Sequence, residues 1–234
     1  MATISEIQNF TRFLCDANTD SYTAANLLIT NNLAYEDVVG KILLADGRWQ
    51  FDDNNFTTFP IATTTLVSGQ RDYTFDVSHL RIERVEILDQ NGDYYKLDPR
   101  DLSDSNVSDT EYSQGSGRPS EYDVRGSSIL LDPPPDAGIS VTLAAGLKVF
   151  FQRTADVFTA AQVTTGTKVP GFASPFHMLI AYKSALPYCL KYKPERVQAI
   201  QLEVDRMERK MVEFYSKRNK DESAVVSMAR VIHR

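Results

Sequence analysis

Side chains that could do acid–base or metal chemistry are few in this 234-residue sequence, and their spacing does not group them. The histidines His79, His177 and His233 have no second histidine four residues away and no neighbouring cysteine, as a zinc site would require. Cys15 and Cys189 are too few for a disulfide framework or a four-thiolate zinc site. The sequence therefore predicts no metal and no other cofactor.

Motifs for covalent catalysis or phosphate binding are also missing. There is no Gly-x-Ser-x-Gly elbow, and Gly115-Ser116-Gly117 leads into a predicted strand instead of the helix that a phosphate-binding loop needs. The adjacent acids Glu36-Asp37 and Asp52-Asp53 are of the right type for acid–base catalysis, but surface pairs of this kind are usually solvated. We expect a protein that is not an enzyme.

Composition narrows the class of protein further. Hydrophobic residues make up 42% and charged residues 24%, which is typical of a globular chain. No apolar run approaches the ~20 residues that cross a bilayer, and the N-terminus lacks a signal-peptide pattern. With two cysteines, the sequence favours a soluble protein of a reducing compartment with no membrane partner.

The formal net charge of -6, from 25 basic and 31 acidic residues, argues against a protein that coats nucleic acid. It is unevenly distributed. Residues 191–234 hold 11 Lys and Arg against 7 Asp and Glu, or +4, which leaves -10 for residues 1–190. Nine acids lie between Asp89 and Asp123. Two readings remain open: ordinary solvated loops and helices, or surfaces of opposite sign that suit layered or head-to-tail association.

Helical patterns occur at both ends of the chain. Thr3 and Glu6 have the spacing of a capping box, and a second helix is predicted from about Thr23, with Gly47 as its stop. Near the C-terminus, Ser174-Pro175 predicts a helix start, Pro187 a kink or break, and Pro194 the start of a helix to about Lys217.

The last predicted helix carries an apolar seam, with steps of three and four residues. It would pack either on the helix from Thr23 to Ala45 or between subunits. Its members are Val197, Ile200, Val204, Met207, Met211 and Phe214.

The middle of the chain changes to strand periodicity. Strands are predicted on both sides of the turn Ser68-Gly69-Gln70 and on both sides of Asn91-Gly92, where both central residues of the turn are expected at positive φ. Further strands are predicted at 121–124, 129–132 and 140–152. Short turns without helices between them indicate an antiparallel sheet.

These patterns predict an α+β fold: an antiparallel β-sandwich or barrel-like domain inserted between N- and C-terminal helices that pack together, with an extended C-terminal tail. The expected divisions are residues 1–55 (helices), 56–160 (β domain, with a polar excursion at 98–120), 161–218 (helices) and 219–234 (tail).

Several segments of the sequence resemble the head-to-tail adaptor (connector or neck ring) proteins of tailed bacteriophages. The resemblance depends on the order and spacing of weak motifs. They are Ala45-Asp46-Gly47-Arg48-Trp49, Thr64 to Tyr73, Leu80 to Ile87, Gly117-Arg118-Pro119-Ser120-Glu121-Tyr122, Ser128 to Asp136, and Pro170-Gly171-Phe172-Ala173-Ser174.

The resemblance implies a virion structural protein at the head–tail junction, made in the host cytoplasm. Such subunits form a homo-oligomeric ring, usually a dodecamer, beneath the portal protein. The ring extends the DNA channel without sequence-specific binding, helps to close the filled head, and joins the tail or a second adaptor or stopper protein. The motifs are structural, so the resemblance assigns no catalytic residue.

Two surfaces are expected to carry this role. The basic ends and apolar centre of the tail are predicted to dock on the portal or a neighbouring subunit, since so short a segment builds no core of its own. Its candidate docking residues are Arg218, Lys220, Val225, Val226, Met228, Arg230, Val231, Ile232 and Arg234. Acids of the polar excursion are predicted to line the channel or an inter-subunit contact, namely Asp101, Asp104, Asp109 and Glu111.

Two other functions compete with this interpretation. A carbohydrate- or host-binding virion or tail accessory module would use the tyrosine-rich β domain and predicts an exposed aromatic cleft. A hydrolase predicts two acids that converge in a pocket with a raised pKa.

Overall fold

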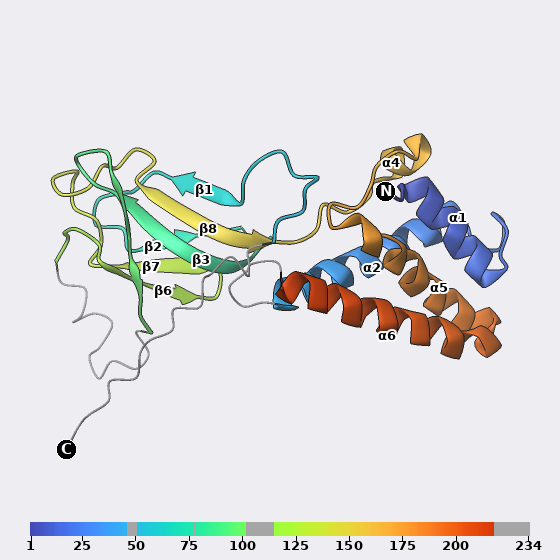
Figure 1. The fold of residues 1–234 in the computed structure, drawn as a ribbon. Coiled ribbons are helices and arrows are strands. Elements are labelled where there is room, and N and C mark those ends of the chain that lie inside the picture. Colours follow the sequence, from blue (N-terminus) through green and yellow to red (C-terminus); the bar gives the residue numbers. More distant parts are fainter. Residues whose placement is uncertain (46–50, 77, 102–114, 218–234) are drawn as a thin grey trace, which may run out of the picture. The chain divides into compact units, whose positions relative to one another are not determined.

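The computed structural model describes residues 1–45, 51–76, 78–101 and 115–217. It is a mixed α+β chain that divides into two compact units (Figure 1). We call Asp52–Asp156 the β unit, and Met1–Phe51 together with the chain from Val157 onward the helical unit. The helical unit is thus built from both sides of the β unit in the sequence.

The first helices follow the predicted signals. Helix α1 (Ile4–Cys15) begins with the expected capping box, in which Thr3 and Glu6 bond each other's backbone N–H groups. Helix α2 spans Ala24–Ala45. A short helix not predicted from the sequence, α4 (Ala160–Thr165), has its own capping box between Thr159 and Gln162.

Helix α5 (Met178–Tyr192) packs against α1, α2 and α6 (Pro194–Ser216), so it is central in the helical unit (Figure 1). Pro187 lies inside α5 and does not end it, contrary to the predicted break. Packing on three neighbouring helices offsets the roughly 3 kcal/mol that an internal proline costs. The predicted cap at Ser174 is wrong as well: Ser174–Phe176 is a separate 3-10 turn, η2, and Ala173 precedes it without a side-chain cap.

The seam of α6 lies within the chain's own helical unit. Ile200, Val204 and Met211 are buried, and α6 packs on α5 and α2. Val197 and Met207 are half-buried, while Phe214 is 46% exposed at the edge of the seam. Tyr215, which the predicted seam did not include, is fully buried in its place.

The β unit contains two four-stranded sheets that are mostly antiparallel. One has the order β1 (Ile61–Thr64), β8 (Leu147–Arg153), β3 (His79–Leu88) and β4 (Tyr94–Lys96). The other has the order β2 (Asp72–Thr74), β7 (Ser128–Asp132), β6 (Glu121–Arg125) and β5 (Asp98–Pro99), with β5 parallel to β6. Residues of both sheets, such as Val85 and Ile129, belong to one buried apolar cluster.

Three local expectations for the β unit need correction. The strands on either side of Ser68-Gly69-Gln70 do not pair with each other, because β1 pairs with β8 and β2 with β7. At Asn91-Gly92 only the glycine has positive φ (88°), and the β3–β4 loop is closed by a bond from Gly92 N to Asp89 O. Residues 140–146 are not part of a strand, and β8 begins at Leu147.

Candidate functional site

Three of the motif segments, far apart in the sequence, meet in the β unit. The backbone N–H of Gly69 donates to Pro135 O over 2.8 Å, and that of Gly117 donates to Pro134 O over 2.8 Å. Gly69 has φ of +73°, a conformation that L side chains rarely adopt. We call this meeting of Thr64–Tyr73, Gly117–Tyr122 and Ser128–Asp136 the motif junction.

Two tyrosines hold the motif junction from inside. The Tyr73 hydroxyl accepts a bond from Val67 N over 3.0 Å, and the Tyr95 hydroxyl donates to Pro119 O over 2.9 Å. The Arg118 guanidinium lies 4.0 Å from the centroid of the Tyr95 ring. Burial raises the pKa of both phenols, so they stay neutral hydrogen-bonding groups. These tyrosines therefore organise loops and do not form an open aromatic cleft.

The loop after the motif junction is organised by one carboxylate. Asp136 accepts bonds from the backbone N–H groups of Gly138, Ile139 and Ser140 and from the Ser140 hydroxyl. The Ser140 hydroxyl bond and then the backbone bonds lower the pKa of Asp136. This turn explains why residues 140–146 do not continue as a strand.

Two acids do lie opposite each other on β6 and β7. Glu121 and Asp132 are register partners, and burial raises the pKa of Asp132 while Arg71 opposes that change. Glu121 is bound by Arg100 at 2.6 Å. A hollow of about 130 Å³ in the β unit is lined by other residues, including Tyr73, Phe75 and Ile129. The pair thus lacks a substrate-sized space in that hollow.

The last motif segment, Pro170 to Ser174, is clasped within the helical unit. Gly171 N donates to the Tyr35 hydroxyl over 2.7 Å, and Ala173 N donates to the Tyr215 hydroxyl over 2.9 Å. His177 is 1% exposed, with ring nitrogens 2.9 Å from Phe172 O and 3.2 Å from Ala2 O. Burial lowers the pKa of His177, although both carbonyls oppose that shift. This histidine joins segments and is not placed as a metal ligand.

A charged cluster ties three helices together. Lys183 on α5 pairs with Asp37 on α2 and with Glu208 on α6, and Lys41 pairs with Glu208 at 2.5 Å. Burial disfavours the charged form of Lys183, but its bonds to the two carboxylates prevail and raise its pKa. The i,i+4 spacing of Asp37 and Lys41 is visible in the sequence, whereas their meeting with α5 and α6 is not.

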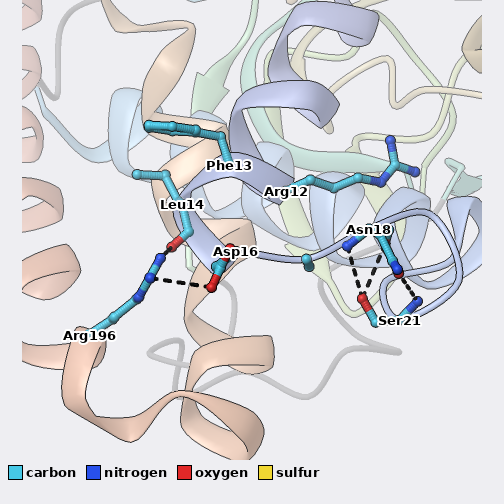
Figure 2. Close-up of a pocket in the computed structure, with 8 residues that line it drawn as sticks. Arg12, Phe13, Leu14, Asp16, Asn18, Ser21 and Arg196 are labelled. Carbon is cyan, nitrogen blue, oxygen red and sulfur yellow. Dashed lines mark hydrogen bonds and ion pairs between the residues drawn. The ribbon is translucent and has the colours of Figure 1, made fainter.

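The C-terminal end of α1 borders the largest polar hollow of the helical unit, about 630 Å³ (Figure 2). Arg196 crosses to this helix end, where it donates to Leu14 O over 2.9 Å and lies 3.7 Å from Asp16. The other lining residues are Arg12, Phe13, Ala17, Asn18 and Ser21. Since Arg196 already binds a carbonyl and a carboxylate, this hollow is not a ready anion site.

The remaining candidates for chemistry also have structural partners. Asp52 binds Arg153 at 2.7 Å, and buried Asp53 accepts bonds from Asn55 N and Asp156 N. His79 stacks on Phe151 with ring centroids 3.5 Å apart. Within residues 1–45, 51–76, 78–101 and 115–217, no three His, Cys, Asp or Glu side chains gather as metal ligands would.

The predicted interaction residues fall mainly outside the described residues. Asp101 is described and exposed. The other candidate channel acids and all the candidate docking residues of the tail lie outside, as do Gly47 and Trp49. None of the helices in the described ranges has the length and apolar content needed to cross a bilayer.

Exposed apolar side chains are a feature that the sequence analysis did not identify. On the helices they include Phe13 (75% exposed), Leu44 (86%) and Leu202 (63%). In the β unit Phe59 is 84% exposed and Ile139 is 80% exposed. Single exposed residues are common on any protein, so the large size of these five is what favours protein contacts.

Comparison with known proteins adds no identity to this geometry. No family model matches the chain, and no curated protein matches it significantly.

Proposed function

We propose that the chain is a structural subunit of a phage head-to-tail adaptor ring. The motif junction carries this proposal. The segments that resemble the adaptor family engage one another through backbone bonds and buried tyrosines. They therefore act as a framework, as expected of a protein whose work is assembly.

The finer architecture belongs to the same proposal. Because residues of both sheets share one apolar cluster, we interpret the β unit as a sandwich. The exposed apolar side chains are assigned to contacts between neighbouring copies in a ring, which needs a different surface on each side of the subunit. Exposed Asp101, with the other acids of its segment, is assigned to the DNA channel, where like charge lets DNA slide.

The rival functions have less support. In an accessory module that binds carbohydrate, the tyrosines of the β unit would face solvent. Here the Tyr73, Tyr94 and Tyr95 hydroxyls bond backbone groups, and Tyr122 is buried. For a hydrolase, Glu121 and Asp132 are the best acid pair, and they do not line the hollow described in their unit.

Assembly with the portal protein encoded in the same genome tests the proposal. The full chain is expected to sediment as a monomer or weak oligomer alone, and to form a ring visible by negative-stain electron microscopy when the portal is added. The matched variant ends at Lys220: it should keep the circular dichroism spectrum of the full chain and fail to join the portal. Rings formed equally well by both chains would refute the docking role of the tail. No association of the full chain with the portal would refute the proposed function itself.

A further inference from the structure

Two free thiols that are distant in sequence lie side by side in the helical unit. Cys15 is the last residue of α1, and Cys189 lies in the last turn of α5. Their Sγ atoms are 3.8 Å apart, and both residues are 0% exposed. A disulfide has an S–S distance of about 2.05 Å, so the sulfurs need to approach by less than about 2 Å.

The surroundings provide a limited approach to this pair. Leu14 and Asp16, the chain neighbours of Cys15, line the hollow of about 630 Å³ at the end of α1 (Figure 2). Helix ends open locally at much lower free energy than helix centres, so the terminal position of Cys15 matters. A small uncharged oxidant in this hollow is separated from the thiol by the final turn of α1 alone.

We propose that Cys15 and Cys189 are an oxidation site that closes a disulfide between α1 and α5 when the protein meets a peroxide. One thiolate attacks the O–O bond, forming a sulfenic acid and releasing hydroxide, which becomes water. The second thiol then displaces the sulfenic oxygen as a second water. Two thiols and one peroxide yield one disulfide and two waters, so the sulfurs lose two electrons and the peroxide gains them.

The same environment keeps the pair reduced under mild conditions. Burial raises the pKa of Cys15 to about 12, and burial also raises that of Cys189, so little thiolate is present at neutral pH. The positive charge of Arg196 opposes both shifts. Oxidation therefore depends on opening of the helix end and is slow compared with that of an exposed thiol.

The disulfide would connect the N-terminal helix to the C-terminal part of the helical unit. It would close a loop that contains the whole β unit, so its effect on the unfolded chain is large. This inference does not depend on the adaptor function, because it concerns the chemistry of a single purified chain.

Peroxide treatment of the purified full chain tests the proposal. After treatment and unfolding in guanidinium, the chain should have lost two hydrogens by intact mass, and neither thiol should react with a maleimide. A non-reducing peptide map should contain the Cys15–Cys189 pair. The thermal transition of the helical unit should rise by about 5–10 °C and return to its starting value after reduction.

The single variants Cys15→Ser and Cys189→Ser are the matched controls. Each should keep the circular dichroism spectrum of the wild type and gain no stability from peroxide. Three outcomes would overturn the proposal: two thiols still reactive in the treated wild type, a disulfide only between chains, or oxygen added to the cysteines without a cross-link.

Discussion

In the helical unit, side chains from opposite ends of the chain meet across helices, whereas in the β unit side chains mostly hold nearby backbone in loops. Lys183 joins three helices through two carboxylates, and Tyr35 and Tyr215 hold a loop between them. Asp136 and Tyr95 instead bond loop backbone. The helical unit thus depends on long-range side-chain pairs, and the β unit depends on backbone geometry.

The largest test of this contrast is a backbone position in the β unit. A Cβ atom at Gly146 would lie 2.1 Å from Thr142 O and 2.7 Å from Leu66 Cδ1. Gly146→Ala is expected to cost about 3 kcal/mol of unfolding free energy, since backbone must move. Hydrogen exchange should accelerate in β3 and β8, with no change in α5. Gly126→Ala is the control: it has space, and only its φ of +60° costs about 1 kcal/mol. Equal losses at the two glycines would contradict the packing argument.

The matching test in the helical unit removes a charge. Lys183→Met leaves Asp37 and Glu208 without their shared partner, and we expect a loss of about 2 kcal/mol. This is below the usual cost of breaking a buried pair because Asp37 is 48% exposed. Chemical unfolding measures the loss, and exchange should accelerate in α2, α5 and α6 but not in the β unit.

Lys217→Met is the control for the charge itself. Its pair with Glu213 is 54% and 64% exposed, so its loss should change stability by less than about 0.5 kcal/mol. A similar cost for both lysines would mean that the Lys183 cluster adds nothing beyond surface charge.

A smaller effect is expected from the loop carboxylate of the β unit. Asp136→Ala should cost about 1 kcal/mol at pH 7, because three backbone N–H groups lose their acceptor. The pKa of Asp136 is lowered from its ordinary 3.8, so its contribution is complete above that pH and is lost as pH falls through the lower folded value. Variant and wild type should therefore converge in stability in strong acid. Asp93→Ala, at an exposed side chain, should differ little from wild type at either pH.

The smallest effect separates the units by pH. Since the pKa of His177 is below its ordinary 6.5, the unfolded chain takes up a proton first as pH falls. The helical unit should lose less than about 1 kcal/mol between pH 7.5 and 5.5. Exchange of α5 amides should report this loss, and His177→Gln should remove its pH dependence. An identical pH response in the variant would assign the loss to another group.

Sequence signals that act within a few residues predicted the structure well. The capping box at Thr3 and Glu6, the start of α6 at Pro194 and the strands β6 and β7 are confirmed. These features depend on local hydrogen bonds, backbone restriction and side-chain alternation, all of which a sequence displays directly.

Features set by packing were not predicted. Nothing around Ser68-Gly69-Gln70 indicates that β1 and β2 enter different sheets, because strand partners are chosen by the whole apolar cluster. Pro187 remains helical because three neighbouring helices hold α5. The motifs were visible singly, but their meeting at the motif junction depends on backbone bonds between residues more than 40 positions apart.

The division of the chain also sets an order for its synthesis. A ribosome releases Met1–Phe51 first, and the helices that complete its core come from beyond Val157. The β unit is contiguous and can close while translation continues, whereas α1 and α2 must wait with their apolar faces uncovered until α5 and α6 emerge. The nascent N-terminal helices are therefore the segment with the longest exposure to chaperones and to other unfinished chains.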